Sequence, residues 1–324
     1  MIGIIGGTGF IGLNLSLYLQ EQSMPCRTFS RNGLLLDRKS IFYPRLSKIE
    51  HIKGDFRDPL AVKEFVKPCR RVVVLVSHLL PSSSVQEIED VISWFGASFV
   101  ELLESCVAAE VEQLVFVSSG GTIYGENPSE SAIDENHPLN SQCAYGAFCA
   151  FLEQLIRNFN HHRRLPFAIL RLGNPYGLLK RPNKEQGLID HYIRSARARK
   201  PFTIFGDGSE VRDYIYIDDI SRLIARVLSS PNPNDTFNIG TGRGHTSREV
   251  IALIRERFDL PEVPIVFSSR RSTDVVCSLL NMDKFEKTYG MRCDISLQEG
   301  LQKYAELEVE EPRRARLDLR RRHR

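Results

Sequence analysis

The stretch Ile2-Gly3-Ile4-Ile5-Gly6-Gly7-Thr8-Gly9-Phe10-Ile11-Gly12 decides how this chain is expected to fold. Its apolar first residues predict a buried strand, and the segment after it, 13–22, is typical of an amphipathic helix. Glycines at positions 6, 9 and 12 let the backbone turn tightly, approach a pyrophosphate and aim the helix N-terminus at it. The motif indicates dinucleotide binding, with a glycine-rich turn that binds no ligand as the alternative. The expected contacts are Gly6, Thr8, Gly9, Phe10, Ile11 and Gly12.

The rest of the first half repeats this alternation of short apolar strands and helices. Near-continuous apolar strands separated by helices indicate a parallel sheet that is covered on both faces. We therefore expect an α/β fold, a Rossmann-type doubly wound parallel sheet with a smaller C-terminal substrate domain. The expected strands are 2–5, one ending at Phe29, 49–52, 71–76, 113–117 and 167–171, and the later helices are 91–109 and 144–159.

After Asn174 the pattern becomes irregular, which favours a second unit built from several short elements. We expect a dinucleotide-binding domain at 1–173 with returning segments near 211–248, a domain mainly at 174–308, and a basic tail at 309–324. The further expected elements are helices at 188–199 and 247–258 and extended segments at 201–205, 214–217 and 236–239.

The positive charge of the chain is concentrated in its last residues. Its 324 residues are 42% hydrophobic and 26% charged, which is typical of a globular protein. Of the net charge of +3, residues 309–324 contribute +4, from seven arginines against three acidic residues, so the first 308 residues carry −1. Because residues 1–308 have no excess of basic side chains, we expect no nucleic-acid partner. The tail is expected to be a solvated terminus, with contact to RNA, anionic lipid or an acidic protein as the alternative.

Two further patterns bear on cellular location and on metals. The sequence has no run of eighteen apolar residues, and its glycine-rich start does not match a secretory signal, so we expect a cytoplasmic protein with no membrane partner. The seven cysteines are scattered without CxxC spacing, and the eight histidines add no ligand cluster. We therefore expect neither a disulfide framework nor a metal site.

The end of the second strand bears on the choice between NAD and NADP. Chains that bind NAD usually carry an acidic residue there to hold the ribose hydroxyls. This chain has Ser30-Arg31, so a 2′-phosphate would be tolerated or preferred, unless Arg31 is an ordinary solvated arginine. The pattern leans toward NADP, and NAD stays open. Asp55, after the third strand, is a candidate partner for the adenine amino group.

With these residues identified, the chain resembles the extended short-chain dehydrogenase/reductases, in particular the NAD-dependent epimerase/dehydratase family typified by UDP-glucose 4-epimerase. The resemblance covers about residues 1–308 and is carried by the glycine motif and by short motifs in family order. These motifs are Ser118-Ser119-Gly120-Gly121-Thr122-Ile123-Tyr124-Gly125, Ala144-Tyr145-Gly146, Arg171-Leu172-Gly173-Asn174-Pro175-Tyr176-Gly177, Phe205-Gly206-Asp207-Gly208, Val211-Arg212-Asp213-Tyr214 and Phe237-Asn238-Ile239-Gly240.

The resemblance implies that Tyr145 is the acid–base residue. The chain differs from the family pattern at two other positions. The family places a lysine four residues after this tyrosine, where its ammonium favours the phenolate, whereas this chain has Cys149. The family's usual serine or threonine in the earlier motif is Gly120 here, which leaves Thr122 and Ser119 as the nearest hydroxyls. Three interpretations stay open: reliance on the cofactor charge and another cation, a different mechanism, or binding without turnover.

The resemblance also implies a nucleotide-sugar site in the second domain, with a UDP-sugar as the expected substrate. Arginines suit a diphosphate, and aromatic faces suit a base. The implied contacts are Asn174 and Arg212 for the diphosphate, Arg271 and Asp274 for phosphate and ribose, and Phe202 for uracil.

The implied activity is that of a UDP-hexose 4-epimerase, with hydride transfer at sugar C4 through bound NAD(P) and with Tyr145 moving the proton. The alternatives are an NADP-dependent nucleotide-sugar 4-ketoreductase or dehydrogenase and a non-catalytic nucleotide-sugar-binding homologue. A dehydratase fits less well because that subgroup has an Asp-Glu pair where Gly121-Thr122 stand. The family often forms dimers through two long helices of each subunit, and 91–109 and 144–159 could supply them, so the resemblance implies a homodimer. A monomer stays open, because the same helices are needed to cover the sheet.

Overall fold

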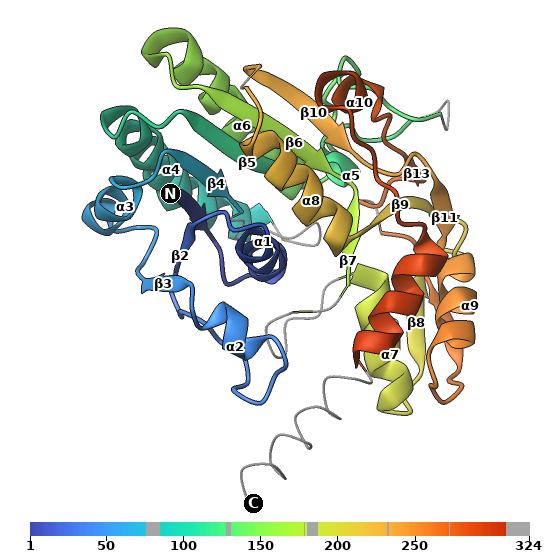
Figure 1. The fold of residues 1–324 in the computed structure, drawn as a ribbon. Coiled ribbons are helices and arrows are strands. Elements are labelled where there is room, and N and C mark those ends of the chain that lie inside the picture. Colours follow the sequence, from blue (N-terminus) through green and yellow to red (C-terminus); the bar gives the residue numbers. More distant parts are fainter. Residues whose placement is uncertain are drawn as a thin grey trace, which may run out of the picture.

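A seven-stranded sheet forms the framework of the computed structural model, which describes residues 1–75, 85–127, 131–177, 179, 187–231, 233–271 and 273–308. All neighbouring strands of this sheet run parallel, in the order β10-β6-β5-β4-β1-β2-β3 (Figure 1). The arrangement confirms the doubly wound α/β fold. The strands are β1 (Ile2–Ile5), β2 (Cys26–Ser30), β3 (Glu50–Lys53), β4 (Arg71–Val74), β5 (Gln113–Ser119), β6 (Phe167–Leu172) and β10 (Asp235–Ile239).

Helices cover both faces of the large sheet (Figure 1). Because both faces are covered, every residue of β1 and β6 is buried, which explains why these strands are near-continuous apolar runs. One face is packed by α1 (Phe10–Glu21) and α8 (Ile217–Leu228), and the other by α3 (Pro59–Val66), α4 (Val85–Ala108) and α6 (Ala144–Arg163). Three short helices are α2 (Tyr43–Leu46), α5 (Gly120–Ile123) and α10 (Asp283–Tyr289).

Smaller sheets and helices follow β6, at the lower right of Figure 1. Strand β9 (Val211–Tyr216) pairs with β7 (Asn174–Tyr176), β11 (Gly244–Thr246) and β13 (Cys277–Ser278), and β8 (Phe202–Phe205) pairs in parallel with β12 (Ile265–Ser268). The helices here are α7 (Gly187–Arg197), α9 (Ser247–Arg257) and residues 297–308. Between these pieces the chain returns to the large sheet as α8 and β10. The domain boundary near residue 173 stays a prediction, and the basic tail, 309–324, lies outside the described residues.

Helix α4 contains one window, Val91–Ala108, that is long and apolar enough to cross a membrane, with a mean hydropathy of 1.4. Phe95, Phe99 and Leu102 of this window are fully buried in the cluster that fills the space between α4 and the sheet. A helix that covers one face of a buried sheet also needs a long apolar side. Helix α4 covers the sheet in this way, so its apolar composition is explained by packing.

Candidate active site

The glycine loop joins β1 to α1 at the carboxyl edge of the large sheet. Gly6 has a φ of +80°, a left-handed conformation that favours glycine. A Cβ on Gly12 would lie 2.5 Å from the Cα of Gly7, so only glycine allows the helix to start this close to the strand. The N-cap is Gly9, which has no side chain to occupy the N–H groups of the first turn. The loop therefore fits a pyrophosphate, which would bind to these N–H groups at the positive end of the helix.

The residues expected at the adenosine end lie at the ends of β2 and β3. The Thr8 hydroxyl donates to the buried Ser30 hydroxyl at 2.7 Å, while Arg31 is exposed. Asp55 is held by Arg57, whose Nη2 lies 2.6 Å from the carboxylate, and these hydrogen bonds lower the pKa of Asp55 to about 2. Asp55 is therefore an ionised acceptor that an adenine amino group would share with Arg57.

The expected catalytic residues lie at the carboxyl end of β5 and in the first turns of α6. Thr122 donates its hydroxyl proton to the Ser119 hydroxyl at 2.8 Å. Tyr145 is half-buried and lies four residues before Cys149, whose thiol is buried, on the same helix. Burial raises the pKa of Cys149 to about 12, so this thiol is protonated at neutral pH. A protonated thiol is a poor nucleophile, which argues against covalent chemistry at this position.

The structure gives a physical reason for the glycine at position 120, where the sequence analysis expected a hydroxyl. A Cβ on Gly120 would lie 2.5 Å from Cδ1 of Leu280 and 3.0 Å from the carbonyl oxygen of Arg171. Leu280 is fully buried, so it has no free space into which to move. The side chain of Leu280 therefore excludes a serine or threonine at position 120, and Thr122 and Ser119 remain as the nearby hydroxyls.

The residues expected to bind the nucleotide sugar lie on the smaller sheets. Asn174 approaches α5, since its Oδ1 lies 3.3 Å from the place a Cβ would take on Gly121. Arg212 donates to the carbonyl oxygens of Val211 and Val276, at 2.9 and 3.4 Å. The carbonyl oxygen of Asp274 accepts a hydrogen bond from Arg270 at 3.1 Å.

The two phenylalanines of β8 differ in exposure, with Phe202 buried and Phe205 exposed. The Phe202 side chain is buried and packs edge-on against Tyr192 at 5.3 Å. Phe205, three residues on and on the opposite face of β8, is 38% exposed, and the guanidinium of Arg271 lies 3.7 Å from its ring centroid. The Phe202 ring expected at the uracil is therefore covered, whereas Phe205 and Arg271 are accessible, and which ring meets a base stays a prediction.

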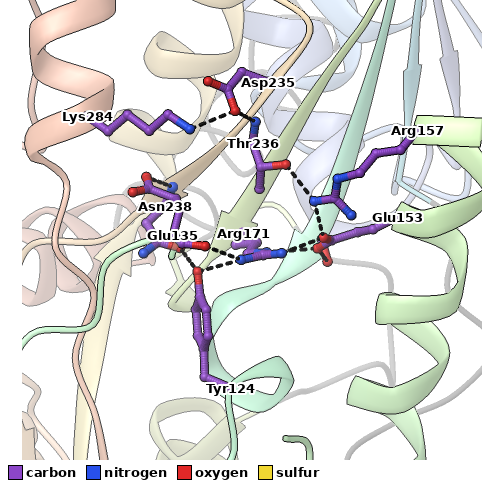
Figure 2. A network of polar contacts seen from close by, with 10 residues as sticks. Tyr124, Glu135, Glu153, Arg157, Arg171, Asp235, Thr236, Asn238 and Lys284 are labelled. Atoms are coloured by element: carbon purple, nitrogen blue, oxygen red, sulfur yellow. Dashed lines mark hydrogen bonds and ion pairs between the residues drawn. The ribbon is translucent and has the colours of Figure 1, made fainter. Parts of the chain in front are cut away.

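A buried polar network that the sequence analysis did not find joins α6, β6 and β10 (Figure 2). Glu153 of α6 is fully buried and accepts hydrogen bonds from Arg171 at 3.0 and 2.7 Å, and Arg157 binds the same carboxylate at 3.0 Å. Arg171 also donates to the Tyr124 hydroxyl at 2.8 Å. The Ser118 hydroxyl donates to Glu153 at 2.7 Å, which links the network to the end of β5.

The parallel, doubly wound sheet and the glycine loop after its first strand define a dinucleotide-binding protein of the Rossmann type. More particularly, the chain belongs to the NAD dependent epimerase/dehydratase family, whose model matches residues 2–240.

Three relatives show what the chain is similar to. The structure of Thermotoga maritima UDP-glucose 4-epimerase with UDP-glucose has a TM-score of 0.85 and 26% identity, covering 95% of this chain and 98% of that one. The Thermus thermophilus UDP-glucose 4-epimerase complex with NAD has a TM-score of 0.83 and 26% identity, over 94% and 98%. The dTDP-4-dehydro-6-deoxyglucose reductase of Escherichia coli is 27% identical over 312 residues, 93% of this chain and 95% of the relative.

These findings confirm the expected family and place the chain among NAD(P)-dependent enzymes that modify nucleotide sugars. The roles of individual residues, and the correspondence of Cys149 to the family lysine, stay predictions.

Proposed function

We propose that the protein is a UDP-hexose 4-epimerase that transfers hydride at sugar C4. The supporting observation is the likeness to UDP-glucose 4-epimerase structures along nearly the whole chain. The Thr122–Ser119 hydroxyl pair and Tyr145 lie at the carboxyl end of β5, the same edge of the sheet that carries the glycine loop. This edge is where open α/β sheets bind their ligands.

Each group of residues has a separate role in this proposal. The glycine loop holds the pyrophosphate of NAD(P), which when bound supplies the hydride acceptor and donor. Tyr145 accepts the proton of the sugar hydroxyl and returns it, while Thr122 holds the same oxygen by a hydrogen bond. Asn174 and Arg212 bind the diphosphate, with Asp274 at the ribose. The exposed ring of Phe205, under Arg271, stacks on the base.

A direct assay tests the epimerase. The protein is incubated with UDP-glucose, UDP-galactose and their N-acetyl forms in the presence of NAD or NADP, and the products are separated by chromatography. We expect one epimer to form, and Tyr145→Phe to lower the rate by about 10²–10⁴-fold because it removes the proton carrier. A protein that binds UDP but forms no epimer and binds neither dinucleotide would instead be a non-catalytic nucleotide-sugar-binding homologue.

An NADP-dependent 4-ketoreductase is the second candidate, and Arg31 is the observation that favours it. Arg31 is exposed at the end of β2, next to a serine that is already held by Thr8, and no carboxylate follows the strand there. A mass spectrum of small molecules released on denaturation identifies a co-purified dinucleotide. A reductase would consume NADPH in proportion to a 4-keto nucleotide sugar, whereas an epimerase recycles its cofactor without net consumption.

We also propose a cytoplasmic homodimer formed through α4 and α6. Ile92 of α4 is 49% exposed and Phe151 of α6 is 43% exposed. The Phe151 ring lies over Gly96 of α4, 3.6 Å from the place of a Cβ on that glycine, so both side chains belong to one apolar surface. Light scattering should give twice the chain mass for the wild type and a smaller mass for Phe151→Glu. A monomeric wild type would overturn the proposal.

A further inference from the structure

We propose that Glu126 is a positioning residue that holds the nucleotide loop, residues 270–276, against the segment that carries the candidate catalytic hydroxyls. The inference rests on the proposed function, because this loop contains Arg271 and Asp274, two of the residues proposed to bind the nucleotide. Glu126 follows Thr122 by four positions and takes no part in the proposed chemistry itself. Its two partners in the loop lie 144 and 150 positions further along the chain.

The two oxygens of the Glu126 carboxylate bind the two ends of the nucleotide loop. Oε1 accepts from Nη2 of Arg270 at 2.7 Å, and Oε2 accepts from the backbone N–H of Val276 at 3.0 Å. The first of these bonds joins two charged groups, which makes it stronger than a neutral hydrogen bond. One side chain therefore fixes both the beginning and the end of this loop.

The same contacts hold the residues proposed to bind the nucleotide. Arg270 also donates through Nε to the carbonyl oxygen of Asp274 at 3.1 Å, which ties the loop across its middle. Arg271 is the next residue along the chain. The carbonyl oxygen of Val276 accepts from Arg212 at 3.4 Å. Arg271, Asp274 and Arg212 are therefore each bonded to, or next to, a residue that Glu126 holds.

The segment on the other side of this connection is firmly anchored. Tyr124, two residues before Glu126, is 1% exposed, and its hydroxyl donates to Asn238 at 2.6 Å and accepts from Arg171 at 2.8 Å (Figure 2). Gly125 has a φ of +76°, and a Cβ there would lie 1.9 Å from a backbone carbonyl oxygen, so the turn requires glycine. Glu126 thus leaves a buried anchor in a direction that the backbone sets.

The connection matters because the nucleotide loop runs between two different small sheets. It joins β12, which pairs with β8, to β13, which pairs with β9, and among the described strands neither β12 nor β13 pairs with β5. Glu126 connects the loop to the chain that follows β5 and α5. The loop is therefore ordered before the nucleotide arrives, which lowers the cost of ordering it on binding.

Calorimetric titration with UDP tests this role without any need for turnover. Glu126→Ala releases both ends of the loop and should weaken UDP binding by about 10-fold, the effect of losing a charged hydrogen bond. Glu126→Gln has one amide oxygen in place of two carboxylate oxygens, so it can accept from only one of the two donors and should give a smaller loss. Equal UDP binding by the wild type and Glu126→Ala would overturn the positioning role.

The chain offers a matched control for the loss of an acidic residue. Glu112, directly before β5 and therefore at the opposite end of this strand, pairs with Arg70 and is 41% exposed, against 40% for Glu126. Glu112→Ala should bind UDP as the wild type does, and circular dichroism should show the same fold for all variants. Equal losses for Glu112→Ala and Glu126→Ala would overturn the proposal, because the loss would then not depend on the nucleotide loop.

A double-variant cycle tests whether Glu126 acts through its partner. Glu126→Ala/Arg270→Ala should bind UDP about as weakly as Glu126→Ala, because both changes release the same loop. Losses that multiply would overturn the pairing.

The split between KM and kcat tests whether the role is one of positioning. In the epimerase assay Glu126→Ala should raise KM for the nucleotide sugar with little change in kcat, since bound substrate still meets Tyr145 and Thr122. A loss confined to kcat would overturn the positioning role. A wild type that binds no UDP would overturn the proposed function together with this inference, whereas a wild type that binds UDP no better than Glu126→Ala would overturn the inference alone.

Discussion

Restoring a hydroxyl at position 120 should succeed only if Leu280 is made smaller. A Cβ on Gly120 would stand 2.5 Å from Cδ1 of Leu280, about 1 Å inside ordinary contact, and 3.0 Å from a carbonyl oxygen of β6. Gly120→Ser alone should therefore cost about 1–3 kcal/mol of stability by overpacking. Leu280→Ala alone should cost about 2–5 kcal/mol, because a fully buried leucine is replaced by a cavity.

The two changes together should cost less than their sum. In Gly120→Ser/Leu280→Ala the clashing methyl group is gone and the serine enters the cavity, so we expect a coupling free energy of about 1–2 kcal/mol. Urea unfolding followed by circular dichroism measures the free energy of unfolding of the wild type, the two single variants and the double variant. Leu102→Ala, a fully buried leucine in another cluster, serves as the control and should combine additively with Gly120→Ser. Additive losses for the Leu280 pair would refute the explanation of Gly120.

Three further predictions concern the candidate site. Arg31→Ala should weaken NADP binding by about 10–100-fold, the effect of losing a charged hydrogen bond, and leave NAD binding unchanged in calorimetric titration; equal losses for both cofactors would contradict this role. Cys149→Lys places a longer, charged side chain at a buried position, so its rate of hydride transfer should not exceed that of wild type, and a tenfold gain would instead show that a lysine at this position can assist Tyr145. Burial raises the pKa of Cys149 to about 12, so native Cys149 should resist iodoacetamide at pH 8 until the protein is unfolded in urea; rapid labelling of the folded protein would contradict this.

The fold was predictable because its signals are local. The strand–glycine–helix pattern of the first residues and the run of apolar strands specify a parallel sheet without any long-range information. The sequence analysis did not predict helix α3, although the start of this helix carries a clear capping signal. Asp58 caps it by accepting from the N–H groups of Leu60 and Ala61, and Pro59 occupies the first position. A search for N-cap and proline pairs would have found this helix.

The parts of the site that sequence reasoning missed depend on distant contacts. Phe202 and Phe205 both lie on β8, and only the position of the core decides which ring is exposed. Glu153 is typical of a solvated helix face by residue type, and it is buried because β6 brings Arg171 against it. Leu280 follows Gly120 by 160 positions, so no local pattern connects them.

Cys149 and Gly120, the two positions where the sequence analysis expected other residues, belong to one packing unit. Cys149 and Leu280 lie in the same buried cluster, together with Tyr124 and Ile133, and Tyr145 packs against its edge. The leucine that excludes a side chain at position 120 therefore also helps to enclose the small thiol at position 149. A long lysine would need the space that this cluster fills. Changing either position alone leaves the other in a cluster shaped for the present pair, so the glycine and the cysteine are parts of one packing arrangement beside Tyr145.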